Sequence, residues 1–113
     1  MRQKSLSEGI SKENPDGVVR KTLAYNDEAM LCHFVLQKGA QIPLHDHRAS
    51  QIGYVVRGRA RFLAENPEDE FEAKTGDTYV LDPHVKHGTL ALEETEYIEV
   101  FTPSRDEYKD FQQ

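Results

Sequence analysis

The sequence predicts an all-β fold in which short strands close into a barrel or a sandwich. Short runs rich in β-branched and aromatic residues recur between turn signals. A helical bundle would need Leu and Ala on a period of about 3.6 residues, and no such pattern is sustained. Strands do not alternate with helical segments either, which argues against a nucleotide-binding parallel sheet. Regular short strands of this kind are typical of sandwiches and barrels.

Length and composition suit one such domain. The chain has 113 residues, of which 37% are hydrophobic and 30% charged, enough for one core enclosed by strands that are polar on one face. We therefore expect residues 1–113 to form a single domain. The net charge of −6 argues against a polyanionic partner. Arg57, Arg59 and Arg61 alternate along the chain beside a turn and are interpreted as a solvated strand face, so no nucleic-acid partner is expected.

The expected strands are separated by residues that favour turns. These include Asn26-Asp27, Gly39, Asn66-Pro67 and Thr75-Gly76-Asp77. Gly58 alone separates two strands, which predicts a tight hairpin at that point. The strands expected from this pattern span residues 18–25, 30–36, 42–47, 51–57, 59–65, 71–74, 78–81, 88–92 and 97–101.

The two ends depart from the strand pattern. We expect residues 1–14 to be a loosely ordered arm or a swapped strand. Residues 104–111 are expected to form a short C-terminal helix, because Ser104 and Glu107 have capping-box spacing. No apolar run approaches the ~20 residues of a membrane span, and the first residues lack the apolar stretch of a signal segment. We expect a cytoplasmic protein whose single cysteine, Cys32, is a packed thiol.

Four of the five histidines lie in two clusters beside expected strands. If residues 42–47 form a strand, His45 and His47 project from the same face and can bind one cation. Gln51 follows at the start of the next strand, where its side-chain oxygen can add a third contact. A fourth ligand would come from His84 or His87. Ordinary surface histidines are the alternative interpretation; His33, inside an alternating strand, is expected to be hydrogen-bonded or exposed.

Such a ligand set would shape the chemistry of the site. Neutral imidazoles and an amide leave the full charge of a divalent cation in place, whereas a carboxylate ligand would cancel part of it. The site would then be a strong Lewis acid that attracts an anionic ligand. One divalent metal ion is expected, and Zn, Ni, Fe, Co or Mn would suit these ligands.

These residues resemble the two motifs of the cupin family, which implies a double-stranded β-helix, or jelly-roll, barrel. The second motif ends at His87, so the resemblance favours His87 over His84 as the last ligand. Cupins include enzymes, sugar binders and storage proteins, so the fold alone does not define a function. The motifs are similar to Gly39-x5-His45-x-His47-x3-Gln51-x6-Gly58 and Gly76-x6-Pro83-x3-His87.

Gln51 narrows the resemblance, because most enzymatic cupins have Glu at this position. At Gln51 and in the segment Glu99-Val-Phe101-Thr-Pro-Ser-Arg105, the sequence resembles the small KdgF-type cupins of pectin and alginate breakdown. Those proteins open the ring of 4,5-unsaturated monouronates to give 5-keto-4-deoxyuronate. The resemblance implies that Glu99, Phe101 and Arg105 line the pocket beside the metal, although the family more often has Asp at the position of Glu99.

The residue types fit such a reaction. Glu99 and Phe101 are two apart on an expected strand and share a face, so a carboxylate for proton transfer and an aromatic wall would both face the barrel interior. Arg105 would grip a substrate carboxylate. The alternatives are a solvated edge strand for Glu99, core packing for Phe101 and a surface position for Arg105.

Two other functions remain open at this point. The first is a cupin dioxygenase, against which Gln51 counts, and the second is a non-catalytic module that binds a sugar or an acid. The expected partner is a small anionic sugar. By analogy with small cupins, a homodimer is also expected.

Overall fold

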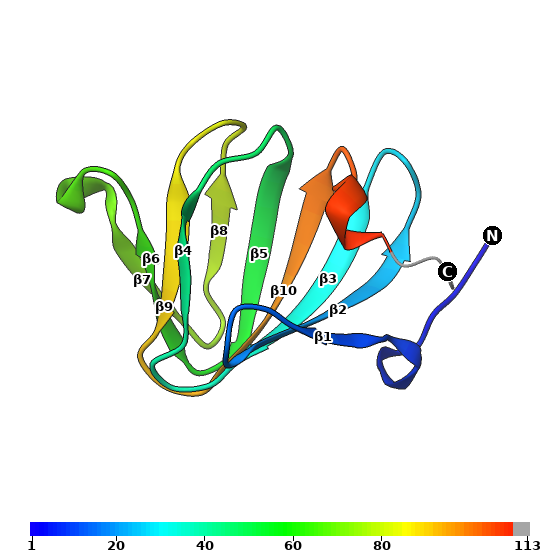
Figure 1. Cartoon of the computed structure of the whole chain (residues 1–113), viewed down its shortest axis with the longest axis horizontal. Coiled ribbons are helices and arrows are strands. Elements are labelled where there is room, and N and C mark those ends of the chain that lie inside the picture. Colours follow the sequence, from blue (N-terminus) through cyan, green and yellow to red (C-terminus); the bar gives the residue numbers. More distant parts are fainter. Residues whose placement is uncertain (110–113) are drawn as a thin grey trace.

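The computed structural model describes residues 1–109 and consists of two antiparallel β-sheets that face each other (Figure 1). The larger sheet has the order β1-β2-β3-β10-β5-β8 and contains β1 (Ser11–Glu13), β2 (Val18–Tyr25), β3 (Met30–Leu36), β5 (Ser50–Arg57), β8 (Thr78–Leu81) and β10 (Thr95–Thr102). The smaller sheet has the order β4-β9-β6-β7 and contains β4 (Gln41–His45), β6 (Arg59–Leu63), β7 (Phe71–Lys74) and β9 (His87–Ala91). The all-β expectation is confirmed.

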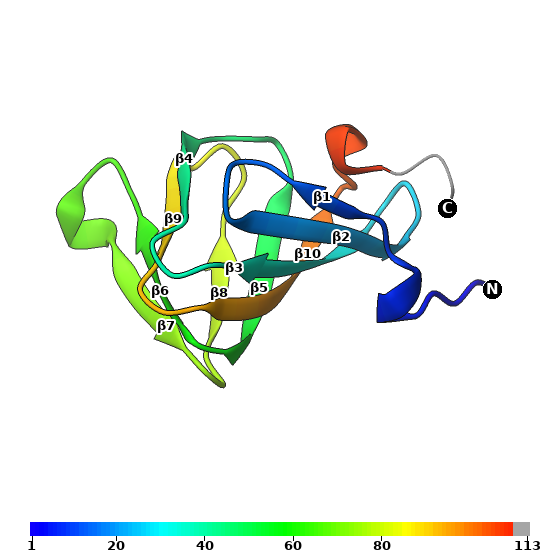
Figure 2. The ribbon, with the colours of Figure 1, turned by 60° about the horizontal axis from the view of Figure 1, so that its bottom comes forward.

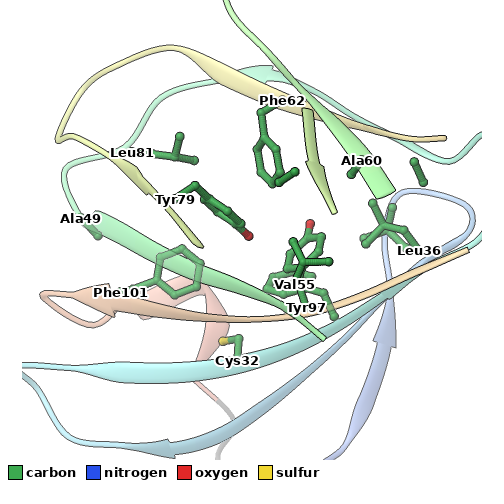
Figure 3. Close-up of a cluster of buried hydrophobic side chains, with 14 of the residues drawn as sticks. Cys32, Leu36, Ala49, Val55, Ala60, Phe62, Tyr79, Leu81, Tyr97 and Phe101 are labelled. Carbon is green, nitrogen blue, oxygen red and sulfur yellow. The ribbon is translucent and has the colours of Figure 1, made fainter. Parts of the chain in front are cut away.

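Strands β5, β8 and β10 of the larger sheet bury alternate residues, as the period of a β-strand predicts. In β10, for example, Tyr97, Glu99 and Phe101 point inward and the residues between them point outward. The inward side chains of both sheets meet in one core (Figure 3). There the ring centroids of Phe62, from the smaller sheet, and Tyr79, from the larger sheet, lie 4.3 Å apart. Cys32 lies in this core, and burial raises the pKa of its thiol to about 11.

The hairpin expected at Gly58 is wrong. Strand β5 pairs with β10 and β8 in the larger sheet, whereas β6 pairs with β7 and β9 in the smaller one. Gly58 therefore marks the corner where the chain passes from one sheet to the other. Its φ of +94° lies in the region that glycine adopts readily, and a one-residue connection can turn this corner because of it.

Substitution at this corner is expected to destabilise the fold. A Cβ atom at Gly58 would lie 2.3 Å from the carbonyl oxygen of Glu94, so Gly58→Ala adds a backbone clash to the cost of positive φ. We expect the free energy of unfolding in urea to fall by about 2–5 kcal/mol. Gly39→Ala is the matched control: φ is +86° but no atom lies within 4 Å of the added Cβ, so about 1–2 kcal/mol is expected. Equal losses in the two variants would contradict the clash.

The expected C-terminal helix is also wrong. Within the described residues the segment contains only a 3₁₀ turn, η3 (Asp106–Tyr108), and Phe111 lies outside them. The capping box expected at Ser104 does not form, because the Ser104 hydroxyl donates to the carbonyl of Asn26 instead. The turn packs against the larger sheet, with the backbone carbonyl of Tyr108 accepting a hydrogen bond from Thr22 (2.6 Å).

The N-terminal segment lies along the edge of the larger sheet of its own chain. It contains a 3₁₀ turn, η1 (Leu6–Glu8), and strand β1, which pairs with β2 at the edge of the sheet (Figure 2). A third 3₁₀ turn, η2 (Pro67–Asp69), joins β6 to β7. None of the helical segments in residues 1–109 is long and apolar enough to cross a membrane. The assignment of the whole chain to one domain, and to the cytoplasm, stays a prediction.

Candidate metal centre

Three histidines converge at one end of the barrel, although not by the route expected from the sequence. Strand β4 ends at His45, so His47 lies in the following loop rather than two residues along the same strand. His45 pairs with His87 across β4 and β9. The ring centroids lie 4.5 Å apart for His45 and His87, 4.9 Å for His47 and His87, and 5.5 Å for His45 and His47.

Local hydrogen bonds define which ring nitrogens face the centre of this cluster. Nδ1 of each histidine lies 2.8–2.9 Å from a backbone carbonyl two residues away in the chain, at Pro43, Ala49 or Val85. A carbonyl only accepts hydrogen bonds, so Nδ1 carries the proton, and in the neutral ring Nε2 carries the lone pair. This is the usual way in which a backbone orients a histidine ligand.

The Nε2 atoms then form a set of electron-pair donors without protons. The potential ligand atoms of His45, His47 and His87 all lie within 4.8 Å of one another. Within residues 1–109, Nε2 of His87 is the buried side-chain nitrogen or oxygen that lacks a hydrogen-bond partner. Such an unpaired buried group is costly unless something outside the protein satisfies it.

Gln51 adds an oxygen to the same set. Its Oε1 lies 3.0 Å from Nε2 of His47, while its Nε2 donates to Oε2 of Glu99 (2.6 Å). Two atoms with lone pairs therefore face each other, a contact that needs either a proton on His47 or a cation between them. Burial, with help from the nearby Arg105 charge, lowers the pKa of His47, which disfavours the proton.

His87 has the same tendency. Burial and the neighbouring His45, His47 and Arg105 lower its pKa to about 4, although the bond to the Val85 carbonyl opposes this. Neutral imidazole is the form that binds a metal. The donor set, its orphaned nitrogen and the facing lone pairs thus fit one divalent cation.

Glu99 lies on the inner face of the larger sheet, not on a solvated edge. It is 2% exposed, on the strand between β3 and β5, and its Oε2 accepts hydrogen bonds from Gln51 (2.6 Å) and from the hydroxyl of Tyr79 (2.5 Å). Burial raises the pKa of Glu99 to about 7, against the opposing effect of these two donors and of Arg105. The carboxyl group holds the Gln51 amide in the orientation that turns its oxygen toward the histidines.

Tyr79, whose hydroxyl donates to Glu99, is a site residue that the sequence analysis did not single out. The ring of Tyr79 passes over Gly53, where an added Cβ would lie 2.1 Å from Cζ of Tyr79. Gly53 lies between Tyr79 and Glu99 in the sheet register. A glycine inside a strand pattern was the signal available, since it often marks a close approach.

Phe101 and Arg105 lie beside the histidines. Phe101 is buried, with its ring centroid 6.0 Å from that of His47. The Arg105 guanidinium carbon lies 5.3 Å from the Phe101 ring centroid and 4.1 Å from that of Tyr108, and the group pairs with the exposed Glu107 at 2.7 Å. Its side chain is only 11% exposed, so the surface interpretation does not apply.

The remaining candidates lie outside the cluster. His84 is exposed with φ +63°, and His33 pairs with Glu96 at 2.6 Å on the outer face of the larger sheet. The three arginines expected on a solvated face form ion pairs with glutamates: Arg57 with Glu94 and Glu96, Arg59 with Glu72 and Glu93, and Arg61 with Glu70.

The chain is thus a small β-barrel protein of two sheets, with three histidines and a glutamine gathered at one end of the barrel. Residues 32–101 match the family model described as a cupin domain, and the chain belongs to the cupin family. The expected jelly-roll barrel is thereby confirmed.

Among cupins, the chain is similar over most of its length to KdgF. Pectin degradation protein KdgF of Dickeya dadantii (strain 3937) is 32% identical over 99 residues, which cover 86% of this chain and 88% of that protein. The structure of KdgF from Halomonas sp. superposes with a TM-score of 0.85 at 29% identity, covering 96% of this chain and all of that one. L-ectoine synthase of Teredinibacter turnerae is 31% identical over 94 residues, 80% of this chain and 71% of that protein.

Proposed function

We propose that this cupin is an enzyme of pectin or alginate breakdown that opens the ring of 4,5-unsaturated monouronates to 5-keto-4-deoxyuronate in a metal-dependent reaction. The observation that carries the proposal is the buried carboxyl group of Glu99, hydrogen-bonded to Gln51 beside the three-histidine cluster. Similarity to a pectin degradation protein supports the substrate class.

His45, His47, His87 and Oε1 of Gln51 would hold one divalent ion, with Zn, Ni, Fe, Co and Mn as candidates. Such an ion supplies Lewis acidity that polarises a substrate oxygen. Because the four ligands are neutral, the site keeps its full positive charge and favours an anionic sugar. Glu99 stays outside this ligand set and remains available for proton transfer.

The reaction is an isomerisation, so the protons removed from the sugar are matched by protons returned to it. The anomeric hydroxyl loses a proton, and the ring C–O bond breaks as the aldehyde forms and the ring oxygen becomes that of an enolate. The enolate becomes a ketone when C4 is protonated. We assign these transfers to Glu99. Both of its hydrogen bonds engage Oε2, which leaves Oε1 to exchange protons with the sugar.

Arg105 is assigned to the substrate carboxylate. Its guanidinium group is fixed over the rings of Phe101 and Tyr108, and a planar carboxylate can replace Glu107 in a bidentate pair. We expect Arg105→Ala to raise KM about 10–100-fold, the value of one charge-assisted contact. Lys109→Ala removes a nearby cation that pairs with Asp27 and Asp106 and should leave KM unchanged. Equal KM values in the two variants would show that Arg105 does not bind the substrate carboxylate.

The function itself is tested by ultraviolet absorbance. Metal-loaded protein should accelerate the loss of absorbance from the unsaturated monouronate that a pectate or alginate lyase releases, and a chelator should abolish this acceleration until metal is restored. Oxygen uptake with the same substrate would instead favour a dioxygenase. Binding of the sugar without turnover would favour a non-catalytic module, and either result would contradict the proposal.

A further inference from the structure

Two donors hold the carboxyl group of Glu99, and the one from outside the candidate ligand set is Tyr79. The Tyr79 hydroxyl donates to Oε2 of Glu99 at 2.5 Å, and the Gln51 amide donates to the same oxygen at 2.6 Å. The three side chains come from neighbouring strands of the larger sheet, in the order β10, β5, β8. The carboxyl group is therefore held at one of its two oxygens, by donors on two different strands.

The ring of Tyr79 is fixed by its surroundings. Tyr79 is 7% exposed, and its ring centroid lies 4.3 Å from that of Phe62 and 6.2 Å from that of Phe71, both on the smaller sheet. On the other side, a Cβ atom added at Gly53 would lie 2.3 Å from the Tyr79 hydroxyl oxygen. The hydroxyl thus reaches across the strand between Tyr79 and Glu99 at the position where that strand has no side chain. A ring packed in this way holds its hydroxyl group in one place.

The two donors differ in what else they contact. The Gln51 amide oxygen faces Nε2 of His47 at 3.0 Å, so the position of this side chain would depend on whether a cation is bound. The Tyr79 hydroxyl lies outside that set. Burial and the nearby Glu99 charge raise the pKa of Tyr79 well above its usual value, so the hydroxyl keeps its proton and remains a donor. Tyr79 is therefore the anchor of Glu99 that is independent of the cation.

We propose that Tyr79 is a positioning residue for ring opening: its hydroxyl anchors Oε2 of Glu99 so that Oε1 faces the sugar. The inference rests on the function proposed above. A carboxyl group with a single donor can turn about its Cγ–Cδ bond, whereas two donors on one oxygen, from different strands, restrain that rotation. Proton transfer requires the carboxyl oxygen to stay within hydrogen-bond reach of the reacting atom, so a restrained carboxyl group transfers protons faster. Tyr79 acts through Glu99 and has no contact with the sugar in this arrangement.

Tyr79→Phe tests this role, because it removes the hydroxyl group and keeps the packed ring. We expect kcat of the metal-loaded full chain to fall about 10–100-fold, the value of one hydrogen bond to a charged group. KM and metal content should stay unchanged, because other residues are assigned to the substrate carboxylate and to the cation. An unchanged kcat, or a loss that appears in KM instead, would overturn the proposal.

Tyr97→Phe is the matched control. Tyr97 is also a buried tyrosine of the larger sheet, but its hydroxyl is hydrogen-bonded to Thr89. Its substitution should leave kcat unchanged. In the double variant Tyr79→Phe, Glu99→Gln, kcat should equal that of Glu99→Gln alone, since Tyr79 acts through the Glu99 carboxyl group. A further loss in the double variant would mean that Tyr79 acts by another route, and would overturn the proposal.

The side-chain amide of Gln51 provides a second measurement that needs no substrate. It donates to the same oxygen of Glu99, so its nuclear magnetic resonance signals should shift in Tyr79→Phe and stay in place in Tyr97→Phe. If the unmodified chain did not open the sugar, the proposed function would fail, while this shift would still show that Tyr79 holds the Glu99 carboxyl group. Unshifted Gln51 signals in Tyr79→Phe would overturn the positioning role whether or not the sugar is opened.

Discussion

His87→Ala is expected to lose both the bound metal and the ring-opening activity. The buried Nε2 of His87 has no partner within the described chain, and its ring lies within 5 Å of both other histidines. Without this ligand, two imidazoles and one amide remain to hold the cation. Metal content by mass spectrometry should fall well below one ion per chain, and the rate should fall by several orders of magnitude.

His84→Asn is the control for this loss. His84 lies in the connection between β8 and β9, three residues before His87, but its side chain is exposed and its φ of +63° suits Asn. The backbone N–H of His84, which donates to the carbonyl of His47 (2.8 Å), is retained. Metal content and rate should stay unchanged. A His87→Ala protein that still holds one ion per chain would exclude His87 as a ligand.

Glu99→Gln is expected to lower kcat by about 10²–10⁴-fold, the usual contribution of a general acid or base. The substituted amide keeps an oxygen that can accept the hydrogen bonds of Gln51 and Tyr79, so the position of Gln51 and the metal content should survive. The rate and the metal content are measured on the same preparation. This separates proton transfer from orientation of Gln51.

Glu96→Gln supplies the comparison on the same strand. Glu96 points outward and pairs with His33 and Arg57, so its substitution should leave kcat unchanged. Only substitution of the inward carboxyl group should then affect the reaction. If Glu99→Gln kept the full rate, Glu99 would act solely by orienting Gln51.

Local pattern was enough to predict most of the strands, but not how they pair. The bounds expected for β2, β3, β7 and β8 match the structure, because runs rich in β-branched and aromatic residues between turn signals are local features of the sequence. The Gly58 hairpin was wrong, since a one-residue break looks the same whether the next strand stays in the sheet or leaves it. The C-terminal helix was wrong because Ser104 finds a partner 78 residues away.

In the candidate site, too, local spacing could be predicted from the sequence and contacts between strands could not. The spacing of the two motifs singled out His45, His47, Gln51 and His87, and the structure brings them together. The hydrogen bond between Tyr79 and Glu99 could not be predicted, because it depends on the register of β8, β5 and β10 and on the missing side chain of Gly53. Contacts across strands depend on pairing that a single sequence does not contain.

The candidate ligands come from opposite walls of the barrel: His45 and His87 belong to the smaller sheet, whereas Gln51 belongs to the larger one. A bound cation would therefore connect the two sheets at this end of the molecule, so cation binding is thermodynamically linked to folding. Saturation at about 100 times the dissociation constant would add about 2.7 kcal/mol to the folded state. The melting temperature then becomes a direct gauge of occupancy that needs no substrate, and each candidate metal can be ranked by the shift it produces.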